Sequence, residues 1–325
     1  MILYKRLETQ MKAVSLAKDL HKNYVVTLLA PSLNLSVIKA ISTMLADKGI
    51  NLLKTKTLAS KEIECVEISI SSDQTIHQRH LTQELLTHIP STLDIAIQEE
   101  NILRQRKRLI VLDMDSTLTQ IEVIDELAKE AGVGDQVVSI TSRAMHGELS
   151  FPEALRERVY LLKGLSESAL EKVYKRMPFT PGAERLLSIL KKMGLRTAVL
   201  SGGFDYFTSR VKEVLKLDDA FSNKLEVVDG VLTGKILGDI VDGEKKLFLM
   251  EEIAQKEGIS IEQIIAVGDG ANDIPMIKHA GLGIAFNAKP AVRKEATYNI
   301  TQKSLITVLY LLGLTEKEIK YFEFE

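Results

Sequence analysis

The sequence has one cysteine, almost no net charge and no long apolar run. Cys65 has no second thiol with which to form an internal disulfide or a zinc site, which favours a reducing compartment. The net charge of −2 gives no sign of nucleic-acid or membrane-surface binding. No stretch approaches the roughly 18 apolar residues of a membrane span, and the N-terminus lacks a signal-peptide core. Together these absences predict a soluble cytoplasmic protein.

What the sequence does contain suits a chain of about two domains, because 325 residues with 45% hydrophobic side chains can form ordinary globular cores. The one dense basic run, RQRKR at 104–108, lies where the sequence pattern changes. We interpret it as a solvated connector between the domains, with a phosphate- or nucleic-acid-binding patch as the alternative.

The first hundred residues alternate between strand and helix patterns. Apolar or alternating runs predict strands, and helical spacing predicts helices, in the order strand 24–30, helix 35–48, strands 51–59 and 63–71, helix 77–89, strand 92–100. This β-α-β-β-α-β order is the split-βαβ pattern, and it resembles the ACT-type regulatory domains. The resemblance suggests serine binding by residues 1–103, with a dimerisation or docking module as the alternative.

From residue 109 onward, apolar strands alternate with helical stretches such as 183–193 and 245–257. LIVLDMD (109–115), RTAVLSGG (196–203) and IIAVGDGAND (264–273) each end a strand in small or polar residues. The alternation predicts a doubly wound parallel sheet, whose ligands bind beyond the carboxyl ends of the strands. The insertion at about 121–178 has helical character and predicts a cap. KLEVVDGVLTGKI predicts a hairpin that turns at Asp229-Gly230.

The paired acids Asp113 and Asp115 carry the first chemical signal. Residues i and i+2 of a strand share a face, so one carboxylate can act as nucleophile while the other serves as acid and base. Two anions this close need a cation, and carboxylate oxygens suit Mg²⁺. Asp269 and Asp273, at the end of another strand, are placed to complete that metal site.

Two further clusters suit a phosphoryl group. Ser201 and Gly202 offer a hydroxyl and backbone N–H groups at a strand end, where they can hold a phosphoryl oxygen. Charge on the transferring group also needs a lysine, and GEKKLFLMEEIA offers Lys245 or Lys246.

In this order, DxDST, SGG, lysine and GDGxND resemble the haloacid-dehalogenase-like superfamily and, within it, the phosphoserine phosphatases. The resemblance covers most of residues 107–300, including the cap sequence MHGELSFPEALRERVYLLKGL. It implies that Asp113 is phosphorylated and that Asp115 handles the proton. It also implies Mg²⁺ held by Asp113, the backbone carbonyl of Asp115, and Asp269, with Asp273 in support.

The family's lysine lies 23 residues before its third acid, so the resemblance selects Lys246 over Lys245, since 269 − 246 is 23. It further implies that Ser201, Gly202 and Lys246 hold the phosphoryl group. Asn272 is expected to contact the phosphate or the attacking water.

The resemblance also implies the substrate residues. Glu122 matches the acid that binds the substrate ammonium. Arg158 matches the arginine that binds the carboxylate, for which a bidentate guanidinium is suited. Met145 and Phe151 match the apolar residues that close over the substrate.

We therefore expect a Mg²⁺-dependent phosphatase that makes L-serine from phosphoserine, the last step of serine biosynthesis, in residues 104–325. A phosphotransferase or a phosphatase of another small phosphomonoester is the first alternative. A phosphate-binding regulatory protein without turnover is the second, which the intact set of Asp113, Asp115, Lys246 and Asp269 opposes. Homodimerisation is a further hypothesis.

Overall fold

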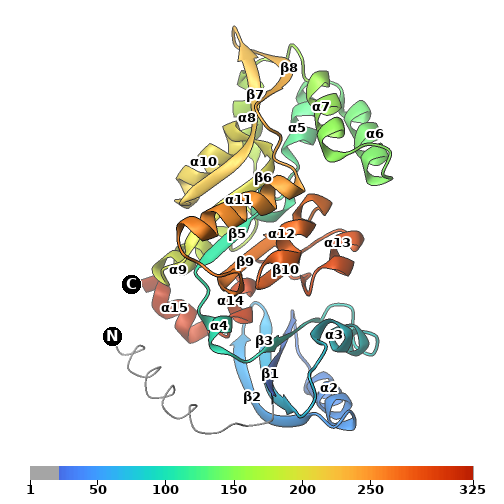
Figure 1. Cartoon of the computed structure of the whole chain (residues 1–325), viewed down its shortest axis with the longest axis vertical. Coiled ribbons are helices and arrows are strands. Elements are labelled where there is room, and N and C mark those ends of the chain that lie inside the picture. Colours follow the sequence, from blue (N-terminus) through green and yellow to red (C-terminus); the bar gives the residue numbers. More distant parts are fainter. Residues whose placement is uncertain (1–21, 325) are drawn as a thin grey trace.

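The computed structural model describes residues 22–324. The N-terminal stretch considered above for a signal peptide lies outside them. The molecule has three parts along its longest axis, with a small α+β domain at one end, a large parallel sheet in the middle and a helical cap at the other end (Figure 1). Among the described residues, no helix is long and apolar enough to cross a membrane.

The N-terminal domain confirms the predicted β-α-β-β-α-β order. Its elements are β1 (Lys22–Ala30), α2 (Leu35–Asp47), β2 (Asn51–Ser60), β3 (Glu64–Ser72), α3 (Gln78–Leu86) and β4 (Asp94–Glu99). The strands form an antiparallel sheet in the order β2-β3-β1-β4. One face of the sheet carries alternate residues such as Val26 and Ile68, which pack against Ile41 of α2 and Leu85 of α3. The helices therefore cover only one face of this sheet.

The second sheet has seven strands in the order β11-β10-β9-β5-β6-β7-β8, and all neighbours are parallel except β7 and β8. Its strands are β5 (Leu109–Leu112), β6 (Arg196–Phe204), β7 (Asp219–Val228), β8 (Val231–Leu237), β9 (Ile264–Gly268), β10 (Leu282–Phe286) and β11 (Tyr298–Ile300). The predicted doubly wound parallel sheet is confirmed, as is the hairpin, whose Asp229-Gly230 turn separates β7 from β8.

Helices cover both faces of this sheet because its strands are apolar on both sides. Leu109 and Val111 of β5 face the layer that contains α11 (Gly243–Lys256) and α12 (Ile274–His279). Ile110 and Leu112 face the opposite layer. That layer contains α9 (Ala183–Lys192), α10 (Asp205–Leu215), α14 (Thr307–Leu311) and α15 (Glu316–Phe324). The short helices α4 (Ile102–Gln105) and α13 (Pro290–Glu295) lie at the edges.

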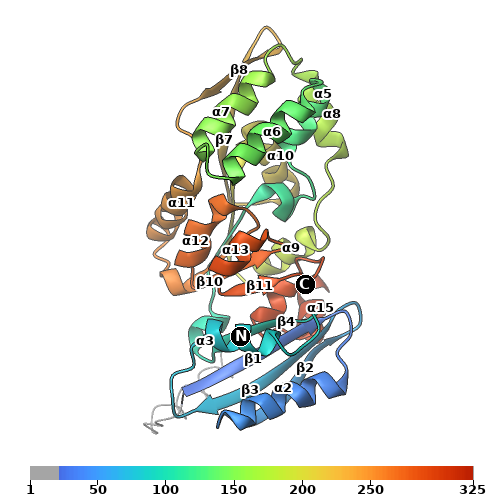
Figure 2. The same ribbon diagram turned by 90° about the vertical axis from the view of Figure 1, so that its right-hand side faces the viewer.

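The cap consists of α5 (Val123–Glu130), α6 (Gly134–Met145), α7 (Phe151–Leu161) and α8 (Ser168–Arg176). In Figure 2 these helices gather at the end of the molecule opposite the N-terminal sheet. The two connections to the sheet pair with each other, since Thr119 and Phe179 form an antiparallel bridge. Gln120, for which the sequence offered no role, donates its side-chain amide to the carbonyl oxygen of Phe179 at 2.8 Å.

The part built on the seven-stranded sheet covers the helix-free face of the N-terminal sheet. Leu29, Cys65 and Ala96 on this face join the same apolar cluster as Leu309 of α14. Around them lie hydrogen bonds between the two parts. Asp94 accepts from the backbone N–H and hydroxyl of Thr301, at 2.7 and 2.8 Å, and from the amide of Gln302 at 3.1 Å. The two domains are therefore joined by a packed interface.

The basic run 104–108 is not the solvated connector that we expected. Arg104 is 4% exposed and forms ion pairs with Glu67 of β3 and Glu100. Lys107 is also buried, and its ammonium donates to the carbonyl oxygen of Glu262 at 2.5 Å. Only the other three residues of the run are exposed. The solvated interpretation failed because a sequence does not reveal that a second domain covers the connector.

Candidate active site

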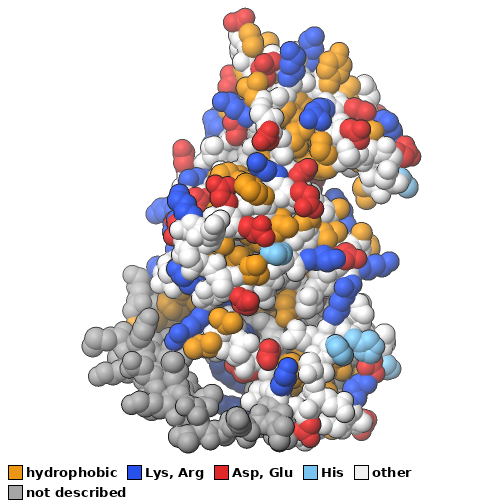
Figure 3. All heavy atoms as spheres, in the orientation of Figure 1, with side chains coloured by type: hydrophobic (Ala, Val, Ile, Leu, Met, Phe, Trp, Pro, Cys, Tyr) orange, Lys and Arg blue, Asp and Glu red, His pale blue; other side chains and the backbone are white. Residues whose placement is uncertain are grey.

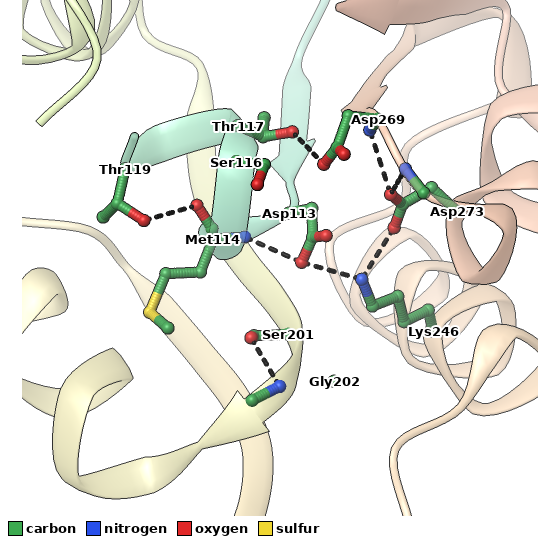
Figure 4. Close-up of polar contacts among 12 residues, drawn as sticks. Asp113, Met114, Ser116, Thr117, Thr119, Ser201, Gly202, Lys246, Asp269 and Asp273 are labelled. Carbon is green, nitrogen blue, oxygen red and sulfur yellow. Dashed lines mark hydrogen bonds and ion pairs between the residues drawn. The ribbon is translucent and has the colours of Figure 1, made fainter. Parts of the chain in front are cut away.

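The predicted polar clusters meet because β9, β5 and β6 are neighbours in the sheet and end at the same edge. Asp113 follows β5, Ser201 and Gly202 lie near the end of β6, and Asp269 follows β9. Figure 4 shows these residues facing one another across the strand ends. Parallel strands therefore bring together side chains that are far apart in the sequence.

Asp113 is held in place from both sides. Its backbone N–H donates to the carbonyl oxygen of Val267 in β9 at 2.9 Å. Its Oδ1 accepts from the backbone N–H of Met114 at 2.7 Å and lies 2.8 Å from Nζ of Lys246 (Figure 4). Its other oxygen, Oδ2, accepts no hydrogen bond from the part of the chain that the structure describes. Asp113 is thus fixed, buried and left with one carboxylate oxygen available.

Lys246 lies at 0% exposure between two carboxylates. Its Nζ is 2.8 Å from Asp113 Oδ1 and 2.6 Å from Asp273 Oδ1. Burial disfavours a charged ammonium, but the charges of Asp113 and Asp273 outweigh burial and raise the pKa of Lys246. Its neighbour Lys245 is only partly buried and pairs with Asp239 at 3.7 Å. The geometry therefore places Lys246, and not Lys245, in the site.

Three buried acids, Asp113, Asp269 and Asp273, can each offer an oxygen to one metal ion, with the three atoms within 4.8 Å of one another. Asp273 already uses both oxygens, one toward Lys246 and the other toward the backbone N–H groups of Asp269 and Gly270 at 3.1 and 2.9 Å. Its position therefore suits support of the site. Asp269 accepts from the hydroxyl of Thr117 at 3.2 Å through Oδ1 alone.

The charge balance of this cluster favours a cation. Three carboxylates face the single ammonium of Lys246, and burial with the charge of Asp273 raises the pKa of Asp269 to about 7. Burial and the charge of Asp273 also raise the pKa of Asp113. The donors are all oxygens, which hard dications such as Mg²⁺ prefer. The residues present therefore fit a divalent metal.

Asp115 lies beside this cluster in a separate environment. Its Oδ1 accepts from the backbone N–H of Val123 at 3.1 Å. A Cβ atom on Gly203 would lie 2.6 Å from its Oδ2, so the glycine leaves room for this carboxyl group. Burial, followed by the charge of Glu122, raises the pKa of Asp115 to about 8. Burial in this environment therefore favours the protonated form of the side chain.

Ser116 joins the strand end to the cap. Its φ of +56° lies in the left-handed region, which is uncommon for a residue with a side chain. Its hydroxyl donates to Glu122 Oε1 at 2.7 Å. The irregular turn Met114–Leu118 therefore aims both Asp115 and Glu122 at the same space.

Ser201 and Gly202 form the opposite wall. The buried hydroxyl of Ser201 accepts from the backbone N–H of Gly203 at 2.9 Å (Figure 4). A Cβ atom on Gly202 would lie 2.8 Å from the ring of Phe151 and 3.1 Å from Nδ2 of Asn272. Only glycine therefore lets the cap residue Phe151 and the loop residue Asn272 come this close to the strand.

The cap supplies Arg158 from α7. Its Nε donates to the carbonyl oxygen of Ala154 at 3.2 Å, and one terminal nitrogen lies 3.5 Å from the hydroxyl of Thr141. Burial lowers the pKa of Arg158, and the charges of Asp125, Glu122 and Asp115 oppose that shift. Met145, at the end of α6, is 68% exposed. It lines the open side of the pocket.

One pocket of about 780 Å³ lies between the cap and the strand ends, beneath the hollow visible on the right of Figure 3. The predicted residues that line it are Asp113, Asp115, Glu122, Met145, Phe151, Arg158, Gly202, Asp269 and Asn272. The other three predicted residues, Ser201, Lys246 and Asp273, are buried behind this lining. The structure thus brings the whole predicted set to one place.

Several residues of the site were not singled out from the sequence. Ser116 and Thr117 are inside the DxDST motif, but only the structure reveals their hydrogen bonds to Glu122 and Asp269. Asp125 and Lys289 also line the pocket. The spacing of Asp125, three residues after Glu122, was a signal that could have identified it. No pattern in the sequence pointed to Lys289.

Comparison with known proteins agrees with this geometry. The family model of the haloacid dehalogenase-like hydrolases matches residues 110–278. A phosphoserine phosphatase of Archaeoglobus fulgidus is 55% identical over 222 residues, which are 68% of this chain and 64% of the relative. The chain therefore spans just under two thirds of that relative.

Two further proteins match both domains. A phosphoserine phosphatase of Saccharomyces cerevisiae is 40% identical over 306 residues, which cover 91% of this chain and 98% of the relative. The crystal structure of a HAD family hydrolase from Salmonella enterica superposes with a TM-score of 0.78 at 31% identity, over 89% of this chain and 98% of that one. The arrangement of a small domain followed by the large sheet therefore occurs in a solved structure.

Proposed function

Because the chain belongs to the haloacid dehalogenase-like hydrolase family, we propose that it hydrolyses O-phospho-L-serine to L-serine and inorganic phosphate. The observation that carries this proposal is a single pocket lined at its base by Asp113 and Asp115 and on its cap side by Glu122 and Arg158. The base suits phosphoryl transfer, and the cap side suits an amino acid. A substrate with a phosphate at one end and an amino acid at the other fits both.

Asp113 acts as the nucleophile. Lys246 and the N–H of Met114 hold one of its oxygens, which aims the carboxylate into the pocket. An oxygen of Asp113 attacks phosphorus, and the bond from phosphorus to the seryl oxygen breaks, which gives an aspartyl-phosphate. Water then attacks the phosphorus of this intermediate, the bond to Asp113 breaks, and inorganic phosphate leaves.

Asp115 moves the proton in both steps. Burial raises its pKa to about 8 and so favours the protonated acid, which donates its proton to the departing seryl oxygen. The resulting carboxylate then takes a proton from the attacking water, which restores the acid. The burial that raises this pKa therefore prepares the residue for its first role.

Lys246, Ser201 and Gly202 bind the phosphoryl oxygens, with the ammonium of Lys246 balancing charge that grows in the transition state. Asn272, above Gly202, contacts the phosphate or the water. Asp113, the backbone carbonyl of Asp115, and Asp269 hold Mg²⁺, while Asp273 orients Lys246 and the backbone beside Asp269. When bound, this ion supplies positive charge that offsets the clustered carboxylates and the phosphate.

The cap binds the rest of the substrate. Glu122, positioned by Ser116, pairs with the ammonium group, and the guanidinium of Arg158 pairs with the carboxylate. Phe151 covers Gly202, and with Met145 it excludes water from the reacting phosphorus.

Phosphate release from a panel of phosphomonoesters in the presence of Mg²⁺ tests the function. We expect turnover of phosphoserine, much weaker turnover of esters that lack its amino or carboxyl group, and none by Asp113→Asn. Equal rates on all esters would remove the roles of Glu122 and Arg158. Transfer to an added alcohol in place of water would favour the phosphotransferase alternative, because both acceptors attack the same intermediate.

We also propose that the N-terminal domain, residues 1–103, is an ACT-like unit that binds serine, and that the protein forms a homodimer in the cytoplasm. The β-α-β-β-α-β order supports the first idea, and the buried, unpaired Cys65 supports a reducing compartment. Calorimetric titration of the full chain with millimolar serine tests the binding, light scattering tests the dimer, and cell fractionation tests the compartment. If the titration releases no heat, the result contradicts serine binding and favours the alternative, a dimerisation or docking module.

A further inference from the structure

Asp125 and Lys289 are two of the four charged residues that line the pocket without a role in the chemistry described above. Asp125 lies in the first turn of the cap helix α5, and Lys289 lies just before α13 in the sheet domain. Together with Arg158, Lys289 is one of the two basic side chains that line this pocket. A second cation is notable because phosphoserine has negative charge at both ends.

Asp125 lines the same pocket as Glu122, Arg158 and Lys289. It follows Glu122 by three residues, so both carboxylates project from neighbouring positions on one side of the helix start. Asp125 is partly buried, and burial with the charge of Glu122 raises its pKa, while the charges of Arg158, Lys129 and Lys289 oppose the rise. Of the neighbouring charges that oppose the lowered pKa of Arg158, that of Asp125 has the strongest effect. Asp125 therefore shares the pocket lining with both cations, and its negative charge acts on both.

Lys289 is anchored through its backbone and free at its end. Its N–H donates to the carbonyl oxygen of Asp269 at 3.3 Å, which fixes the loop beside the buried acids. Its side chain is exposed to solvent, and its ammonium has no hydrogen-bond or ion-pair partner within residues 22–324. An ammonium held at a pocket wall without a protein partner can accept an anionic group of a ligand.

The two cations differ in how much of their hydrogen-bonding capacity the protein already uses. Arg158 directs Nε to Ala154 and a terminal nitrogen toward Thr141, which leaves part of its guanidinium for a ligand. Lys289 keeps all three of its donors. Since Arg158 comes from the cap and Lys289 from the sheet domain, a carboxylate between them would contact both parts of the protein.

Resting on the proposed function, we propose that Lys289 is a specificity-determining residue that supplies a second cation to the substrate carboxylate, and that Asp125 is a positioning residue that keeps Arg158 and Lys289 on either side of that carboxylate. The pocket then recognises the amino-acid end of phosphoserine with two cations and the acid Glu122. An ester without the carboxylate, such as O-phosphoethanolamine, gains nothing from Lys289.

The test compares KM and kcat for phosphoserine and O-phosphoethanolamine in four proteins: the wild type, Lys289→Met, Lys289→Arg and the control Lys245→Met. Lys289→Met is expected to raise KM for phosphoserine about 5-fold with kcat nearly unchanged, since an exposed ion pair is modest in strength. KM for O-phosphoethanolamine stays the same. Lys289→Arg keeps most of the affinity, and Lys245→Met behaves as the wild type.

Asp125→Asn tests the positioning role. It is expected to raise KM for phosphoserine about 3-fold, and the double variant with Lys289→Met is expected to be no worse than about 5-fold, because both changes disturb one contact. Asp125→Glu restores the affinity. A thermal unfolding scan of each variant verifies that it is folded.

The outcomes separate the two proposals. If the wild type does not hydrolyse phosphoserine, the proposed function fails. If the wild type is active but Lys289→Met raises KM equally for both esters, the lysine serves the phosphate and the inference is overturned. Unchanged KM for both esters overturns it as well, and so does a fully additive double variant.

Discussion

The active site and the interface between the two domains both bury charged side chains, but the interface pairs these charges with groups of opposite polarity, whereas the active site gathers several carboxylates around one ammonium. Asp94 accepts three hydrogen bonds from Thr301 and Gln302, and Arg104 pairs with Glu67 and Glu100. In the active site, burial and neighbouring carboxylates act together to raise the pKa values of Asp113, Asp115 and Asp269. At the interface burial also raises the pKa of Asp94, but the hydrogen bonds from Thr301 and Gln302 oppose that rise.

The degree to which the protein pairs its buried charges distinguishes a structural charge from a functional one. A buried charge that the chain pairs completely holds the fold in one arrangement, and removing its partner leaves an isolated charge that destabilises the protein. A cluster of like charges that the chain leaves unbalanced is typical of a site that awaits a ligand. Substitutions in the two regions should therefore affect different properties.

The largest effect is expected for Asp113→Asn. Loss of the nucleophile should reduce kcat for phosphoserine by at least about 1,000-fold. The free energy of unfolding of the metal-free protein should not fall, because the change removes a carboxylate that burial disfavours. Phosphate release and urea denaturation measure the two quantities. Substantial residual turnover would contradict the mechanism, and a large loss of stability would contradict the comparison.

At the interface, Arg104→Met is expected to lower the free energy of unfolding by about 3 kcal/mol, because it leaves Glu67 buried without its partner. The matched control is Arg106→Met, two residues away in the same basic run but exposed. It should change stability by less than about 0.5 kcal/mol. Urea denaturation followed by circular dichroism measures both changes. If the two variants lose the same free energy of unfolding, the buried ion pairs of Arg104 do not stabilise the protein.

Asp94→Ala should cost about 2 kcal/mol, because the N–H of Thr301 and the amide of Gln302 lose a charged acceptor in a buried setting. Turnover of phosphoserine should stay within about 2-fold, since Asp94 is far from the pocket lining. Asp47→Ala, on an exposed position of the same domain, is the control. A variant that keeps its stability but loses activity would reveal coupling between the interface and the active site.

The last effect is a gradual one with pH. The folded-state pKa values of about 7 for Asp269 and about 8 for Asp115 lie above the ordinary value of 3.8. The folded, metal-free protein therefore binds these protons more tightly than the unfolded chain does. The stability that these two groups contribute is complete below about pH 4, falls as the pH rises from there, and has been lost once the pH has passed about 7 for Asp269 and about 8 for Asp115.

Added Mg²⁺ should reverse that loss, since a dication favours the charged carboxylates. The rise in Tm on adding Mg²⁺ should be larger at about pH 8.5 than at about pH 6. Differential scanning calorimetry of metal-free and metal-loaded protein measures it. A metal effect that does not depend on pH would show that the acids are already ionised without the ion.

Much of this could be predicted from the sequence because its patterns are local. The apolar strands that end in Asp113, Ser201 and Asp269 needed only the rule that parallel strands place their carboxyl ends together. The turn at Asp229-Gly230 followed from the backbone preferences of its residues.

What the sequence could not provide depends on contacts between distant segments. Arg104 resembles any residue of a charged connector until the N-terminal sheet covers it. Lys289 lies 20 residues after Asp269, and only the position of its loop beside β9 brings it to the pocket. Long-range packing decided both cases, and local propensity did not.

The single cysteine can serve as a natural chemical probe of how often the two domains separate. Cys65 is fully buried on the sheet face that packs against α14, and burial raises the pKa of its thiol. A thiol reagent can therefore react only while the interface is open, so its rate counts opening events without any introduced label. If this rate is measured with and without serine, a change would reveal whether the reaction product makes the interface between the domains open more often or less often.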